Sequence, residues 1–247
     1  MTENAALSKL STKEDVFAHD VFNIVALSII APLDLYYLWH TTSMSSYSTP
    51  IPCDAGTACD PKEMNYLAEK VIYFFVAYLV LDIAWILRVP SSVQSKPSLI
   101  IVHHIATLCL VAIPVLDDRW YWHGMIDLVS EVNTLFLTLK RIVPQGGLSF
   151  QLSNLLFYFT WGVSRVLLFP VLAVYFTYIY IDLTEKKLGG NYLNPYAVGP
   201  ALQLLLAGFS AWWTYLLVVK KGQAPPIPPK ENALKKGSAS SKGDKLK

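Results

Sequence analysis

The segment His103–Arg141 reads HHIATLCLVAIPVLDDRWYWHGMIDLVSEVNTLFLTLKR. It predicts two apolar helices on either side of a short polar break at 117–119. Both helices carry side chains that hydrocarbon rejects: His103, His104 and Thr107 in the first, and His123, Asp127, Glu131 and Asn133 in the second. An ionisable side chain at the centre of a membrane span costs about 3 kcal/mol or more, so it usually faces a protein interior or a water-filled cavity. Several such residues together indicate a site.

The composition of the whole chain is that of a multi-span membrane protein. Of 247 residues, 53% are hydrophobic and only 15% are charged, whereas a soluble domain is typically about 25% charged. At about 20 residues per span, this length allows about six or seven spans and no large soluble domain. The net charge of +2 is too small to indicate a nucleic-acid partner.

The apolar segments predict an all-α transmembrane bundle of about six spans around a lipid-accommodating cavity. The spans are expected at 16–39, 66–87, 98–116, 120–140, 150–181 and 196–219. The fifth is longer than an upright span requires, and a tilt or a kink at Pro170 absorbs the excess. The membrane domain at 16–219 is therefore flanked by a polar segment at 1–15 and a disordered, proline- and lysine-rich tail at 220–247.

Positive charge beside the spans predicts that both termini are cytoplasmic. With this orientation the cytoplasmic flanks hold Arg88, Lys96, Lys140, Arg141, Lys220 and Lys221. The loop at 40–65 then lies on the opposite side. It contains Cys53 and Cys59, which form either a disulfide or two free thiols.

The 1.5 Å rise per helical residue sorts the polar side chains of the spans by depth. One expected layer contains Asp82, His103, His104 and Thr107, and a deeper layer contains Asp34, His123, Asp127 and Arg165. Glu131 lies between the two layers.

His123, Asp127 and Glu131 are spaced four residues apart and share one face of their helix. A carboxylate one turn from a histidine can fix its tautomer, so this stripe can line a cavity with a nucleophile or general base in it. Structural alternatives remain open: an interhelical bond for Asp34, an ion pair with Asp127 for Arg165, and membership of the aromatic belt for His123. A metal site is not expected, because no two histidines share a face with ligand spacing.

In these features the chain resembles the TLC family of multi-span membrane proteins of the endoplasmic reticulum and Golgi, which includes the ceramide synthases. The resemblance covers about 66–219. It is carried by Asp82, the HHIAT run at His103–Thr107, the EVNTLF run that starts at Glu131, and Arg165.

Ceramide synthases carry HHxxT followed by H-D-x-x-D-x-x-L-E-x-x-K. The second window here begins at His123 and keeps its second aspartate, Asp127, and its glutamate, Glu131. Gly124, Ser130 and Thr134 replace the first Asp, the Leu and the Lys. These three departures mean that the chain is not expected to be a standard ceramide synthase.

By this resemblance, His123 is the acyl-accepting nucleophile, Asp127 and Glu131 support it, and His103 and His104 line the cavity. Asp82, Thr107, Asn133, Arg165 and Asp34 are the further cavity residues expected.

The resemblance implies acyl-CoA-dependent N-acyl transfer to a long-chain or sphingoid amine in the endoplasmic reticulum or related endomembranes. Acyl-CoA is then a co-substrate, and no bound cofactor is expected. The partners are membrane lipids, and a homodimer is compatible with the sequence. The alternatives are a non-catalytic lipid-binding or lipid-sensing protein and, less favoured, a small carrier.

Overall fold

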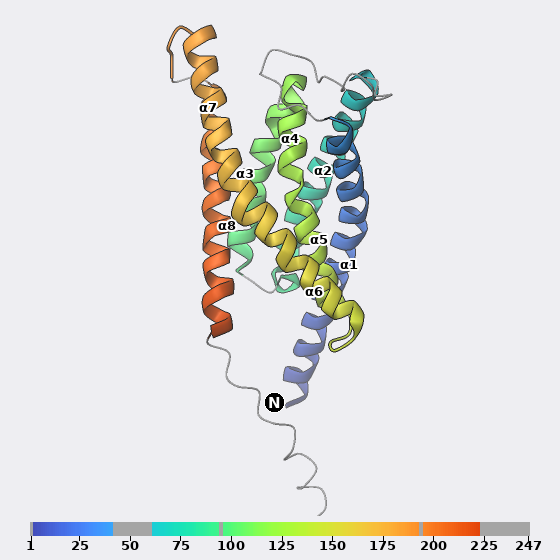
Figure 1. Ribbon diagram of the computed structural model, residues 1–247. Helices are drawn as coiled ribbons and strands as arrows, with labels where there is room; N and C mark the ends of the chain where they lie inside the picture. Colours follow the sequence, from blue (N-terminus) through green and yellow to red (C-terminus); the bar gives the residue numbers. More distant parts are fainter. Residues whose placement is uncertain (1, 42–60, 94–95, 193–194, 223–247) are drawn as a thin grey trace, which may run out of the picture. The chain divides into compact units, whose positions relative to one another are not determined.

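The computed structural model describes residues 2–41, 61–93, 96–192 and 195–222, and these residues are almost entirely helical (Figure 1). In chain order the helices are α1 (Thr2–His40), α2 (Pro61–Arg88), α3 (Pro97–Leu116), α4 (Tyr121–Leu128), α5 (Ser130–Ile142), α6 (Leu148–Thr160), α7 (Phe169–Lys187) and α8 (Val198–Gly222). A π-helix, η3 (Trp161–Leu168), joins α6 to α7. The short 3-10 turns are η1 (Pro90–Ser92), η2 (Asp118–Trp120) and η4 (Pro195–Ala197). The predicted multi-span, all-α fold is confirmed.

Five helical segments are long and apolar enough to cross a membrane: Lys13–His40, Lys62–Arg88, Pro97–Leu116, Leu148–Lys186 and Val198–Val219. The span expected at 120–140 corresponds to α4 and α5, which meet at Val129. Together they cover Tyr121–Ile142, or about 33 Å at 1.5 Å per residue, which is enough to cross the hydrocarbon core. Their polar side chains lower the hydropathy of this segment, and most of them are buried.

The long apolar segment at 148–187 is one continuous helix rather than two spans. It crosses α5 obliquely (Figure 1). The kink or tilt expected at Pro170 takes the form of this oblique path together with the π-helix that ends at Leu168, directly before α7 begins. A π-helix widens the backbone locally and often marks a functional site.

Two clusters of buried apolar side chains hold the helices together. One joins α1, α2 and α4, and includes Leu27, Ile30, Phe75 and Met125. The other joins α3, α7 and α8 and includes Leu172. The polar residues described below lie at and between these clusters, so their positions are fixed by the packing of apolar neighbours.

The described chain divides into a compact unit that ends at Trp212 and a second unit that begins at Trp213. Every site residue discussed below belongs to the first unit. Of the second unit the structure describes the last part of α8, up to Gly222. Cys53, Cys59 and most of the predicted tail lie outside the described residues.

Candidate functional site

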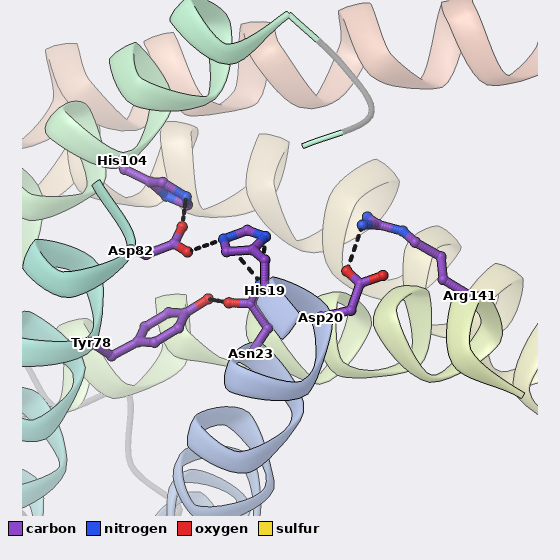
Figure 2. Close-up of polar contacts among 7 residues, drawn as sticks. All are labelled: His19, Asp20, Asn23, Tyr78, Asp82, His104 and Arg141. Atoms are coloured by element: carbon purple, nitrogen blue, oxygen red, sulfur yellow. Dashed lines mark hydrogen bonds and ion pairs between the residues drawn. The ribbon is translucent and has the colours of Figure 1, made fainter. Parts of the chain in front are cut away.

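A buried carboxylate on α2 connects three helices. Asp82 accepts hydrogen bonds through both oxygens, from His19 Nε2 of α1 at 2.5 Å and from His104 Nε2 of α3 at 2.7 Å (Figure 2). The side chains of His19 and Asp82 are only 5% and 3% exposed. Because a carboxylate accepts and cannot donate, both imidazoles carry a proton on Nε2. The predicted proximity of Asp82 and His104 is confirmed.

The network continues along α1 to a second polar residue. Asn23 Nδ2 donates to His19 Nδ1 at 3.4 Å, and Asn23 Oδ1 accepts from the hydroxyl of Tyr78 at 2.8 Å (Figure 2). Nε2 of the His19 ring therefore faces Asp82, and Nδ1 faces the Asn23 amide. Asp20 points the other way and pairs with Arg141 of α5 at 2.9 Å.

Neither His19 nor Asn23 was predicted as a site residue. The available signal was a histidine and an amide four residues apart in the first apolar span. Their partners lie on α2, and a single sequence does not show which helices meet.

A second group of polar residues lines a small cavity deeper between the helices. Its polar lining residues are His103, Thr107, Asp127, Ser130, Glu131 and Arg165. Five of these six are predicted site residues, and the structure brings them together from α3, α4, α5 and η3. The adjacent histidines therefore separate: His103 faces this cavity, whereas His104 binds Asp82.

This cavity has a volume of about 20 Å³. One water-sized sphere needs about 10–15 Å³, so the space accommodates one small polar group rather than an acyl chain. Its charged residues act on one another electrostatically, with Glu131 attracted by both Arg165 and His104. The cavity is thus a small polar space bordered by apolar side chains.

Arg165 enters the cavity from the π-helix. Its side chain is buried, and its guanidinium lies over the ring of Phe169, 5.1 Å from the ring centroid. Nη2 donates a long hydrogen bond to Thr134 Oγ1 at 3.4 Å, while Nε and Nη1 have no hydrogen-bond partner among the described residues. The ion pair considered between Arg165 and Asp127 is not formed among the described residues, and Asp127 Oδ1 accepts instead from Gln203 Nε2 of α8 at 3.0 Å.

Asn133, predicted to line the cavity, instead bonds the backbone where the π-helix begins. Its Nδ2 donates to the carbonyl of Phe157 at 3.0 Å and to Thr160 Oγ1 at 3.1 Å. It does not appear among the lining residues of the cavity. Asn133 therefore acts on the site indirectly, through the conformation of the helix that carries Arg165.

The substitution Asn133→Ala is expected to lower the free energy of unfolding by about 1–3 kcal/mol, because the two hydrogen bonds from its amide to the Phe157 carbonyl and to Thr160 Oγ1 are lost. It should also speed hydrogen exchange at 157–165, which is measurable by mass spectrometry in detergent micelles. Thr138→Ala is the matched control, because the Thr138 hydroxyl bonds only within its own helix, to the carbonyl of Thr134. Equal exchange in both variants would contradict this role for Asn133.

His123 lines a separate cavity of about 30 Å³. Its ring lies among aromatic side chains, with centroids 4.8 Å from Trp120, 5.4 Å from Phe176 and 5.9 Å from Tyr175. Neither ring nitrogen has a hydrogen-bond partner among the described residues. His123 is buried, so it faces the protein interior even though it also belongs to an aromatic cluster.

Asp127 lines both cavities, together with Leu110 and Val111. The His123 cavity in turn shares Ile113 and Tyr196 with an open hollow of about 740 Å³ at the α3–α4 end. Each of the three spaces therefore shares wall residues with the next.

Asp34 is fully buried on α1, and both of its carboxyl oxygens lack a hydrogen-bond partner among the described residues. Asp127 and Glu131 act on it electrostatically, which agrees with its predicted depth. It does not line either cavity. Among the described residues, no group of three or more His, Cys, Asp or Glu side chains is arranged to hold a metal ion.

The departure from the ceramide-synthase signature at Gly124 has a structural cause. A Cβ at this position would lie 2.9 Å from Pro114 Cγ and 3.4 Å from Ile72 Cδ1. Helices α3 and α4 therefore approach too closely for the aspartate of the signature. The glycine belongs to the packing of this chain and leaves His123 without an adjacent carboxylate.

In comparison with protein families, the chain matches the TRAM/LAG1/CLN8 family, described as the TLC domain, over residues 17–219. Neither the curated proteins nor the solved structures give a match of comparable significance. The match covers most of the chain, and it includes all the site residues described above. The chain is therefore an integral membrane protein of the TRAM/LAG1/CLN8 family, a TLC-domain family linked to lipid biology.

Proposed function

We propose that this protein transfers an acyl group from acyl-CoA to a long-chain amine, with His123 as the acyl acceptor. The observation that carries the proposal is the uncommitted imidazole: His123 lines a cavity and neither ring nitrogen is hydrogen-bonded within the described residues. His19 and His104, in contrast, are held by Asp82. A nucleophilic histidine needs a free lone pair, and His123 has one.

The proposed reaction has two steps. In the first, a ring nitrogen of His123 attacks the thioester carbonyl carbon, the C–S bond breaks, and the electron pair leaves with the CoA thiolate. The remaining ring proton passes to Asp127, which lies one helical turn away and lines the same cavity.

In the second step a neutral amine attacks the acyl carbon. The bond between this carbon and the ring nitrogen breaks, and its electron pair returns to the imidazole. The surplus amine proton goes to the ring, and the proton held by Asp127 goes to the thiolate. The products are an N-acyl amine and CoA thiol, and both side chains regain their starting states.

The remaining polar residues support the reaction from the walls of the adjoining cavity. Glu131 and Arg165 face the adjoining cavity, next to the Asp127 that both cavities share. His103 and Thr107 complete its polar wall. We place the reaction in the endoplasmic reticulum or a related endomembrane, with both termini cytoplasmic, on the basis of the positive flanks and the family. A homodimer is compatible with this reaction.

The experiment is mass spectrometry of the purified protein after incubation with palmitoyl-CoA, intact and after digestion. We expect an acyl adduct on the peptide that contains His123, and its loss in His123→Ala. His40→Ala is the matched control, since His40 lies at the outer end of α1 beside Tyr36. An adduct that persists in His123→Ala, or none in the wild-type protein, would rule out this mechanism.

A second candidate function is non-catalytic lipid binding, which one observation favours. Gly124 and its contact with Pro114 exclude the aspartate that ceramide synthases carry next to the histidine. Palmitoyl-CoA or palmitate that co-purifies without any covalent adduct, equally in the wild-type protein and in His123→Ala, would support binding alone.

A further inference from the structure

We propose that Arg165 is the binding site for the carbonyl oxygen of an acyl lipid. This inference rests on the proposed function only in taking the ligand to be an acyl lipid, and it holds for binding without catalysis. It assigns a specific role to a residue that the transfer mechanism above does not use.

The first argument is the incomplete hydrogen bonding of the guanidinium. Arg165 is 6% exposed, and its Nε and Nη1 lack partners among the described residues. The one hydrogen bond it makes, to Thr134 Oγ1, is long at 3.4 Å. A buried polar group without a partner is costly, so such a group indicates a ligand or an ordered water.

The second argument is the shape of the cavity that Arg165 lines. At about 20 Å³ it holds one small polar group. The neighbouring walls are apolar and include Phe169 and Leu206. A lipid can therefore place a single oxygen here, while its chain lies outside the cavity.

The third argument concerns the charge of the ligand. Glu131 lines the same cavity and already attracts Arg165 electrostatically. Asp127 also lines the cavity, and Asp34 lies within electrostatic range of both acids. The acidic side chains that already lie in and beside this cavity disfavour a further full negative charge on the ligand. A neutral carbonyl oxygen, which accepts hydrogen bonds without adding a charge, fits this environment better than a carboxylate.

The test is photo-crosslinking of the full-length protein in lipid nanodiscs. The probe is N-ethyl palmitamide with a diazirine and an alkyne on its chain. The competitors have the same 16-carbon chain and differ in the polar group. Unlabelled N-ethyl palmitamide presents a neutral carbonyl, palmitic acid presents a carboxylate, and hexadecyl ethyl ether has no carbonyl. Cross-linked peptides are mapped by mass spectrometry.

We expect the amide to compete at least tenfold better than the ether, with the acid weaker than the amide. In Arg165→Gln the affinity for the amide should fall about 10- to 100-fold, the range for a lost hydrogen bond to a charged group. Arg165→Lys keeps the positive charge but loses the forked pair of N–H donors. Its affinity for the amide should therefore lie between that of the wild type and that of Arg165→Gln. Arg141→Gln is the matched control, because Arg141 is outside the cavity and pairs with Asp20. It should bind as the wild type does.

Equal competition by amide and ether, or an unchanged affinity in Arg165→Gln, would overturn this inference. If palmitic acid competes better than the amide, the inference is also overturned, because the bound group is then a carboxylate and not a neutral carbonyl. If Arg165→Gln does not fold, Leu206→Phe is used in its place. The larger side chain fills the cavity and leaves the guanidinium unchanged, so the preference for the amide over the ether should be lost. The Arg165→Gln variant can also be incubated with palmitoyl-CoA. If the His123 adduct still forms and the affinity for palmitoyl-CoA is unchanged, this inference is overturned and the transfer mechanism stands.

Discussion

Replacing Asp82 with alanine is expected to lower the free energy of unfolding by about 2–5 kcal/mol, because the N–H groups of one buried imidazole, His19, and one partly buried imidazole, His104, lose their acceptor. The carboxylate is the one group that bonds both His19 of α1 and His104 of α3. Its loss should therefore loosen the attachment of α1 to the rest of the helices. The measurement is the unfolding midpoint in detergent micelles, by tryptophan fluorescence against sodium dodecyl sulfate.

Two further variants distinguish the loss of these hydrogen bonds from the general effect of removing a buried charge. Asp82→Asn keeps one acceptor oxygen, so its loss of stability should be about half that of Asp82→Ala. Asp20→Ala is the matched control, because Asp20 is a buried carboxylate on α1 whose partner, Arg141, can reach water. It should cost about 1 kcal/mol or less. A control as destabilised as Asp82→Ala would contradict a special role for the network.

The effect of Asp82→Ala should also be coupled to His19. In a double-mutant cycle with His19→Ala, the two losses should be less than additive by about 1–3 kcal/mol, because both variants break the same hydrogen bond. Additive losses would mean that the short contact between these side chains contributes nothing to stability.

The fold was predictable from the sequence because its main signal is local. Runs of about 20 apolar residues predict spans wherever they occur, and five of the six expected spans are helices long enough to cross a membrane. The division of the expected fourth span at Val129 was not predictable. The helices α4 and α5 contact α1, α2 and η3, and the periodicity of one segment contains no information on these contacts.

The candidate site was predictable in its composition and less so in its contacts. Depth along the helices correctly joined Asp82 with His104, since helical rise alone sets that coordinate. Rotation about each helix axis was not determined. The sequence therefore did not show that His103 and His104 face different groups, or that Asn133 bonds the backbone of α6.

Residues on distant helices were the hardest to predict. His19 and Gln203 are polar residues in apolar spans, near opposite ends of the chain. Each is identified as a site residue only by its hydrogen-bond partner, which is Asp82 for His19 and Asp127 for Gln203. A single sequence contains no information on such pairs unless depth and helix order are both known.

Restoring the aspartate of the ceramide-synthase signature, by Gly124→Asp, is expected to unfold the protein rather than to activate it. A Cβ at 124 would lie 2.9 Å from Pro114 Cγ, and this atom belongs to a rigid ring inside α3. Helices α3 and α4 would have to separate. The added carboxylate would also be buried against the apolar side chain of Ile72. Overpacking and the buried charge together should cost about 4 kcal/mol or more.

Gly124→Ala separates the steric part of this cost from the electrostatic part. It adds only the Cβ, so its expected cost is about 1–3 kcal/mol. The same sodium dodecyl sulfate titration measures both variants. The combination of Gly124→Ala with Pro114→Ala should be more stable than the sum of the single effects by about 1 kcal/mol or more, because the ring that meets the Cβ is gone.

The pairing of Gly124 with Pro114 also bears on function. If the double variant is rescued, the loss of the first signature aspartate is a consequence of how closely α3 and α4 pack around His123, and the chain cannot regain that aspartate by one substitution. His123 must then act, if it acts as a nucleophile, with Asp127 alone as its nearby carboxylate. A stable Gly124→Asp variant that gains acyl transfer would contradict this and would show that α3 and α4 separate easily at this point.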